Sequence, residues 1–406
     1  MFNAMNDIEK INIYFLPLAA FFVLISTAVT NFFTILTVLT AFIICIKNNN
    51  FSSIYKENFF KACLFIYFLL VVSYTYSIAD PNEVTDALKK YIKIVYIPFI
   101  YYYLKKYKNE QMVINFFIYG SSLVLVLSYI KYFDLIKFEY FYEYIEFLSM
   151  SGFSESIINT KAIIFQNYII HGVILSFYSF TCLYLASKNK NYVFYALSAL
   201  AFVNVVFLND SRTAYIIITL LSLLSFYKVI TNNRIRLIFL LIISILLSSS
   251  FSENLKNRIN IVSINKANVE IENYHSSLGL RYIWSKVGMD VFTTDPILGR
   301  GVGSFYNSTI IYFKKYNKNI SEKFISNNPH SEFISISAQL GILGLLSFII
   351  FLYYLITSST SLMSIAVSLV FVVSALFNSV FYDNMLGLFS IIIISLFFKN
   401  KVKLQN

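Results

Sequence analysis

The chain has 406 residues, of which 58% are hydrophobic and only 13% are charged, with a net charge of +11. Ordinary soluble domains are about 25% charged, so this composition excludes a typical soluble globular protein. The apolar residues are gathered in long runs from end to end, many of them close to the roughly 20 residues that a helix needs to cross a bilayer. The sequence therefore predicts an all-α polytopic membrane protein.

The apolar runs divide the chain into twelve predicted spans, which would place both termini on the same side of the membrane. Several of these runs are shorter than a perpendicular span of about 20 residues requires. The predicted spans cover residues 11–29, 32–46, 59–79, 91–104, 111–130, 162–186, 192–208, 213–227, 237–250, 333–356, 362–377 and 386–398.

The distribution of Lys and Arg gives the predicted orientation, because cytoplasmic loops carry an excess of positive charge. The two terminal segments and every second loop between them together hold 15 basic residues and four acidic ones, which accounts for the whole +11. These segments are predicted to be cytoplasmic. The basic character thus reflects membrane topology, and no basic motif typical of nucleic-acid binding is present.

The predicted spans divide the chain into three parts. Residues 1–250 are predicted to form a bundle of nine spans, residues 251–331 a long periplasmic loop, and residues 332–406 three further spans. Loops of such length are usually functional. The segment 280–292 alternates apolar and polar residues at helical spacing, so we expect an amphipathic helix whose Trp284 lies at the membrane interface.

Two smaller features limit other interpretations. The three cysteines, Cys45, Cys63 and Cys182, all fall in apolar runs, which supports neither a disulfide framework nor a thiolate metal site. No cleavable signal peptide is predicted, because charged residues precede the first apolar run and no A-x-A-like site follows.

Arg212 ends a short external turn, Asn209-Asp210-Ser211-Arg212, directly before the eighth predicted span. Asp210 or Ser211 can cap the helix that follows. The free N–H groups at its start, together with the guanidinium, would suit an anion such as a lipid phosphate. The alternative is an Arg that extends to the interface and pairs with Asp210.

His330 opens the tenth predicted span and is one of three histidines. On an ideal helix Ser337, Gly341 and Gly344 share its face, so we expect a small-residue stripe that lets another helix pack closely. An imidazole at such a junction can act as a general base. The alternative is a His that only caps the helix.

Other candidate residues carry weaker signals. Arg281 lies on the amphipathic segment, and Arg300 lies in the turn Gly299-Arg300-Gly301-Val302-Gly303. This turn does not have the pattern of a phosphate-binding Walker loop, which favours a simple tight turn. His171 and His275 have no further ligand at metal-binding spacing, so no metal site is predicted.

Three motifs resemble those of the O-antigen ligase and O-antigen polymerase family of bacterial membrane glycosyltransferases. The first is the turn Asp210-Ser211-Arg212-Thr213-Ala214, which is similar to an S-R-x-A element. The second is Arg281 followed by Pro296-Ile297-Leu298-Gly299-Arg300-Gly301. The third is His330-Ser331, nine residues, then Gly341-Ile342-Leu343-Gly344, which looks like the ligase signature H-[NSQ]-x9-G-x-x-G.

This resemblance implies a GT-C-like helical fold and a metal-independent, inverting glycosyltransferase that needs no cofactor. Arg212 and Arg281 would hold the pyrophosphate of an undecaprenyl-linked glycan donor, with Lys161 and Arg300 as further candidate contacts. His330 would deprotonate the acceptor hydroxyl. The site would face the periplasm at the inner membrane.

The resemblance leaves the acceptor open. A ligase passes O-antigen to the lipid A-core in lipopolysaccharide biosynthesis, whereas a polymerase joins lipid-linked repeat units. The histidine signature favours the ligase, although Leu345 stands where ligases commonly have a smaller or polar residue. From another class, a transporter or flippase of lipid-linked glycans would also suit twelve spans. Transporters, however, place polar residues near the bilayer midplane, and here they gather at the predicted external ends.

Overall fold

The computed structural model describes residues 7–49, 51–136, 162–228, 277–316 and 325–398, and all regular structure within these ranges is helical. The first half of the described chain contains α1 (Asp7–Asn12), α2 (Phe15–Phe22), α3 (Thr27–Lys47), α4 (Ser52–Tyr55), α5 (Asn58–Ser73), η2 (Tyr74–Tyr76), α6 (Pro81–Tyr91), α7 (Lys93–Tyr107) and α8 (Glu110–Tyr132). The second half contains α11 (Tyr168–Asn189), α12 (Tyr192–Val203), η3 (Asn204–Leu208), α13 (Arg212–Lys228), α16 (Ser277–Thr294), α17 (Phe305–Lys315), α18 (Glu332–Thr357), α19 (Leu362–Phe377) and α20 (Asn384–Phe397).

Five helical segments of the described chain are long and apolar enough to cross a membrane, and five more are apolar but shorter. The all-helical fold is confirmed, whereas the count of twelve spans stays a prediction, and the predicted span 237–250 lies outside the described residues. The predicted division between the first two spans is wrong. α3 begins at Thr27 and not at residue 32, because Ser26 is its N-cap and accepts a hydrogen bond from the N–H of Val29 at 3.4 Å.

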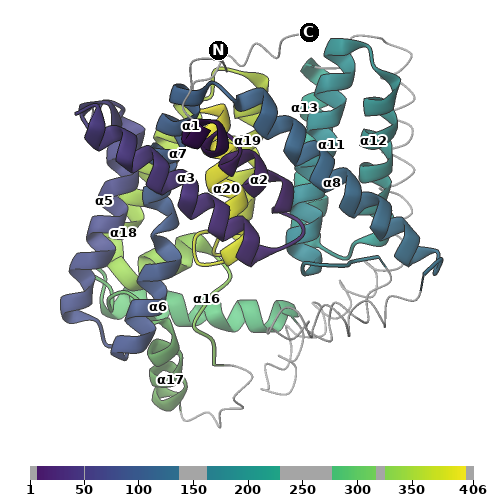
Figure 1. The fold of residues 1–406 in the computed structure, drawn as a ribbon. Coiled ribbons are helices and arrows are strands. Elements are labelled where there is room, and N and C mark those ends of the chain that lie inside the picture. Colours follow the sequence, from purple (N-terminus) through teal and green to yellow (C-terminus); the bar gives the residue numbers. More distant parts are fainter. Residues whose placement is uncertain (1–6, 50, 137–161, 229–276, 317–324, 399–406) are drawn as a thin grey trace.

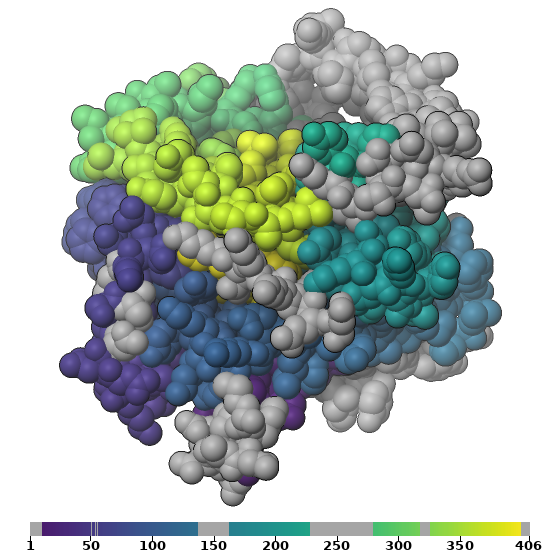
Figure 2. All heavy atoms as spheres, turned by 90° about the horizontal axis from the view of Figure 1, so that it is seen from above, coloured from purple at the N-terminus to yellow at the C-terminus, as the bar shows by residue number. Residues whose placement is uncertain are grey.

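The longer helices form a bundle, and α16 runs across one of its ends (Figure 1). We call this end of the bundle the α16 end, and α1 lies at the opposite end. Figure 2, which looks onto that opposite end, shows the segment from α18 to α20 in yellow-green between the purple and blue N-terminal helices and the teal helices α11 to α13. Segments far apart in sequence therefore share one core.

The predicted amphipathic segment is a helix, α16, and a second helix, α17, follows it in the same loop. Both pack on the first turns of α18 through a small apolar cluster that is separate from the main core. The cluster contains Ile283, Trp284, Val287, Val291, Phe305, Phe313 and Ala338. This cluster holds α16 against the start of α18.

α18 is broken at Gly341, whose φ of +60° and ψ of −150° are not helical. A left-handed φ of this kind favours glycine. The backbone of the preceding loop fills the break, because the N–H of Ile342 donates to the carbonyl of Pro296 at 2.8 Å. A Cβ at Gly341 would lie 2.4 Å from the carbonyl oxygen of Ile297, so no larger residue fits.

Candidate functional site

His330 lies in a tight turn before α18 and not on the helix itself. Its φ of +55° is left-handed, a conformation that Asn, Asp and His adopt more readily than most residues. Its N–H donates to Oδ1 of Asn328 at 2.9 Å, and Ser326 donates to the carbonyl of Asn328 at 2.8 Å. Ser331 then takes the N-cap position of α18. The turn thus fixes the backbone direction at His330.

This geometry corrects the predicted stripe of small residues. The stripe assumed one ideal helix from His330 through Gly344, but His330 precedes the helix and Gly341 interrupts it. At Gly341 the close neighbour is the backbone of Ile297 in the loop, and a Cβ at Gly344 would meet Leu340 of the same helix. Gly341 therefore permits the break in α18 and its close packing with the loop, whereas Gly344 packs against Leu340 within the helix.

α16 presents an aromatic ring to His330. The ring centroids of Trp284 and His330 are 5.0 Å apart, and the ring planes are inclined by 33°. Trp284 is only 8% exposed, so the expectation that it lies at the membrane interface is wrong. It packs in the apolar cluster between α16, α17 and α18 instead. Arg281, three residues earlier, lies on the same side of α16.

The electrostatics of His330 and Arg281 favour a neutral imidazole beside a positively charged guanidinium. Burial and, to a lesser extent, the positive charge of Arg281 lower the pKa of His330 to about 4. Burial also lowers the pKa of Arg281, against an opposing effect of Tyr168, but an arginine stays protonated near neutral pH. No carboxylate of the described residues forms an ion pair with Arg281. A half-buried cation of this kind is suited to bind an anion.

The turn before Arg212 is built as the sequence predicts. Ser211 is the cap of α13, since its Oγ accepts from the N–H of Ala214 at 3.2 Å. Asn209 accepts from the N–H of Ser211 at 2.7 Å, and its amide donates to the carbonyl of Tyr168 at 2.9 Å. Arg212 follows as the first, exposed residue of α13.

Tyr168 relates the two arginines to each other. It begins α11, its carbonyl accepts from the turn that precedes Arg212, and its hydroxyl influences the pKa of Arg281. The turn before Arg212 and the side chain of Arg281 therefore both lie near the first residue of α11. Because His330 responds to the charge of Arg281, the three principal predicted residues all lie at the α16 end.

A glycine lets α13 approach α11 closely at this point. A Cβ at Gly172 would lie 2.6 Å from the Cβ of Ala214 and 2.9 Å from the amide nitrogen of Asn209. Just before the turn, the chain widens into the π-helical turn η3, where buried Asn204 hydrogen-bonds to His171 at 3.2 Å and to Ser128 at 2.8 Å. Single π-turns of this kind are common at functional sites.

The glycine turn 299–303 is a structural junction. Each of its five backbone N–H groups already has an acceptor, at 2.9–3.0 Å: the carbonyls of Asp295, Ala338 and Gln339, the hydroxyl of Ser73, and the side-chain oxygen of Gln339. The prediction of a tight turn is thus confirmed. No backbone donor of the turn remains for a phosphate.

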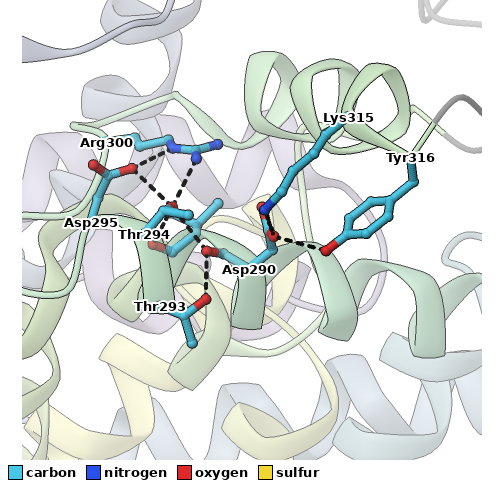
Figure 3. A network of polar contacts seen from close by, with 8 residues as sticks. Asp290, Thr293, Thr294, Asp295, Arg300, Lys315 and Tyr316 are labelled. Carbon is cyan, nitrogen blue, oxygen red and sulfur yellow. Dashed lines mark hydrogen bonds and ion pairs between the residues drawn. The ribbon is translucent and has the colours of Figure 1, made fainter.

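Arg300 is held within the same junction. Its Nε donates to Asp295 at 2.7 Å and its Nη2 to Thr294 at 2.9 Å (Figure 3), and its side chain is 11% exposed. The neighbouring ion pair of Lys315 with Asp290, at 2.6 Å, joins α17 to α16. These contacts give Arg300 a structural role. Lys161, the other secondary candidate, lies outside the described residues.

A buried polar network beside His330 was not predicted. Gln339 donates to Ser335 Oγ at 2.9 Å and to the hydroxyl of Tyr91 at 3.3 Å, while accepting from Gly303. Glu332 is fully buried and accepts from the N–H of Phe381 at 2.9 Å. The signal was present, because polar residues at 332, 335 and 339 recur at helical spacing within an apolar run.

No cluster of His, Cys, Asp and Glu among the described residues could hold a metal ion. Of the other two histidines, His171 is buried against Asn204, and His275 lies outside the described residues.

The apolar helices are those of a membrane protein, and Arg212, Arg281 and His330 form a candidate site at one end of the bundle. The sequence model of the O-antigen ligase family matches residues 196–349. This range contains the Arg212 turn, α16, the glycine turn, His330 and the break in α18. This part of the chain is therefore similar to the O-antigen ligase family. No curated protein matches it.

Proposed function

We propose that this protein transfers a glycan from undecaprenyl pyrophosphate to an acceptor hydroxyl, without a metal and with inversion at the anomeric carbon. The observation that carries the proposal is the placement of Arg281 beside His330, with the Arg212 turn at the same end of the bundle. A cationic site that accepts a pyrophosphate and a neutral base are the two groups that such a transfer requires.

In the proposed reaction the acceptor oxygen attacks the anomeric carbon of the donor sugar while its proton passes to His330. The bond between that carbon and the pyrophosphate oxygen breaks, and the pyrophosphate leaves with the electron pair. Arg212 and Arg281 stabilise the departing charge through forked N–H donors. The lipid chain of the donor explains why the site adjoins the bilayer.

Donor binding would also strengthen the base. The positive charge of Arg281 contributes to the low pKa of His330. A pyrophosphate beside Arg281 would offset that charge, so the pKa of His330 would rise and the imidazole would accept a proton more readily. His330 would then be a stronger base with the donor bound than in the free protein.

For the acceptor we propose the lipid A-core, which makes the protein an O-antigen ligase of lipopolysaccharide biosynthesis. The excess of basic residues supports an orientation in the inner membrane with both termini cytoplasmic and the α16 end in the periplasm. The pattern that favours a ligase is His330-Ser331 followed by Gly341 and Gly344. Polymerisation of lipid-linked repeat units uses the same chemistry and is the alternative.

The test is a lipopolysaccharide gel from a host that makes the cognate O-antigen and lacks this protein. Restoring the gene should convert bare core into a full ladder, and His330→Ala should not. Asn327→Ala is the matched control, because Asn327 is exposed in the same turn. Core that carries one repeat in the deletion strain would identify a polymerase. An unchanged gel would contradict both activities and favour transport or another acceptor.

A further inference from the structure

Two large apolar residues lie exposed at the α16 end, in a loop that does not span the membrane. Ile297 is 64% exposed and Leu298 is 49% exposed. They follow Asp295 and Pro296 after the end of α16 and precede the glycine turn. We call this pair the Ile297–Leu298 tip. Adjacent exposed side chains of this size are unfavourable in water, so their surroundings need an explanation.

On one side the tip adjoins α5. The hydroxyl of Tyr76, just beyond α5, donates to the carbonyl of Leu298 at 3.0 Å. α5 and the short turn after it present an apolar outer face along their length, as expected for a span that contacts lipid. The exposed members of that face are Phe65, Phe68, Val71, Val72 and Tyr74.

On the other side the tip adjoins the break in α18. Residues 332–341, before the break, include no exposed position. After the break one face of the helix becomes exposed and apolar at helical spacing, with Leu343, Leu346, Ile349, Ile350 and Tyr353. The carbonyl of Pro296 binds the N–H of Ile342 at 2.8 Å. The outward apolar face of α18 thus begins where the tip contacts it.

The length of α18 after the break agrees with this arrangement. The part of α18 after the break, residues 342–357, rises about 24 Å at 1.5 Å per residue, which is less than the roughly 30 Å of a bilayer core. The tip lies next to the first residues of this segment, at the α16 end, and extends its apolar surface. The nearest charges, Arg300 and Asp295, are paired at 2.7 Å, as charges close to hydrocarbon usually are.

We propose that the Ile297–Leu298 tip inserts into the lipid bilayer between α5 and α18 and fastens the long loop to the membrane surface. The partner is the lipid of the leaflet at the α16 end. Because α16 ends at Thr294, only two residues before Pro296, this anchor fixes the height of α16 and of Arg281 relative to the lipid headgroups. The inference rests on the fold and does not depend on the proposed transfer reaction.

The experiment places a nitroxide spin label at Leu298→Cys in protein reconstituted into phosphatidylcholine nanodiscs. The matched control is Lys314→Cys, an exposed position on α17, which lies beyond α16 from the bundle (Figure 1). The native cysteines are buried, and the unsubstituted protein serves as the labelling blank. Accessibility to oxygen, which concentrates in lipid, is compared with accessibility to a water-soluble nickel chelate.

We expect the label at 298 to be accessible to oxygen and protected from the nickel chelate, and the label at 314 to show the reverse. Equal exposure of both labels to the nickel chelate would overturn the proposal, because the tip would then lie in water. Protection of the label at 298 from both reagents would also overturn it, since protein and not lipid would cover the tip. Activity does not enter the measurement, so a failure of the proposed transfer reaction would leave the result intact.

Discussion

The ring of Trp284 lies 5.0 Å from the ring of His330 and shields one face of the imidazole from water. Burial is the largest cause of the low pKa of His330, so removing the indole should raise this pKa. We expect Trp284→Ala to shift the pH at which His330 becomes reactive toward diethyl pyrocarbonate from about 4 toward the ordinary value near 6.5. Peptide mass spectrometry resolves His330 from the other two histidines.

Trp284→Phe, which keeps a ring at this position, should shift the pKa less. Tyr282→Ala is the control for general effects on α16, because Tyr282 is exposed. An unchanged reactivity profile in Trp284→Ala would show that the indole does not shield the imidazole.

Arg281 supplies the second cause of the low pKa of His330. Arg281→Gln should therefore also raise that pKa, by less than Trp284→Ala does, while it weakens donor binding. A wild-type reactivity profile together with lost transfer activity would mean that Arg281 binds the donor without influencing His330. Arg281→Lys should keep the low pKa and lose only part of the activity, because a point charge lacks the forked donors.

The same pKa predicts how stability depends on pH. The folded protein protonates His330 only near pH 4, whereas the unfolded chain does so near pH 6.5. Between these values the unfolded state binds more protons, so the contribution of His330 to the free energy of unfolding decreases as the pH falls from 6.5 to 4. His330→Gln should flatten this dependence in thermal unfolding experiments in detergent. An equally steep loss of stability would assign it to other groups.

Close packing at Gly172 positions the Arg212 turn. Gly172→Ala should reduce transfer activity, because its new Cβ would lie 2.6 Å from that of Ala214. Adding Ala214→Gly removes the colliding methyl group and should restore much of the activity at normal protein levels. Ala214→Gly alone is the control for helix destabilisation, which is about 1 kcal/mol. A double variant no better than Gly172→Ala would mean that Asn209, and not Ala214, sets the approach.

Gln339 joins α18 to the glycine turn and to Tyr91. Gln339→Leu leaves the half-buried N–H of Gly303 without its acceptor, and we expect a loss of about 1–3 kcal/mol, measured by thermal unfolding in detergent. Ser337→Ala is the matched control, because Ser337 Oγ binds only within its own helix, to Ile334 at 3.1 Å. Equal stability of the two variants would show that the Gln339 side chain does not stabilise the junction of α18 with the glycine turn.

The sequence predicts the helical membrane fold, the helix at 280–292 and the cap at Ser211, because apolar runs, amphipathic spacing and turn residues are local properties. The roles of Arg212, Arg281 and His330 stay predictions. It does not predict the break in α18. Read as one helix, residues 330–344 give a stripe of small residues, and only the backbone of a loop more than 30 residues earlier shows why Gly341 departs from it.

The contact of Trp284 with His330 is similarly non-local. In the sequence alone, Trp284 resembles a residue that anchors a helix at the membrane interface. In the fold, α17 and α18 enclose it. Arg300 is the opposite case, a candidate phosphate contact whose side chain has partners within the protein. Its position in a glycine-rich turn permits phosphate binding, and only the structure shows that its Nε and Nη2 already donate to Asp295 and Thr294.

The break at Gly341 has a consequence for how the chain is assembled during synthesis. The carbonyls of Ala338 and Gln339 receive their hydrogen bonds from Arg300 and Gly301, which leave the ribosome before α18 does. The break in α18 therefore depends on the glycine turn, because a broken helix without the turn would leave these two carbonyls without donors. The glycine turn, which is also bound to Ser73 at the end of α5, thus links a helix made early in synthesis to the break in a helix made late.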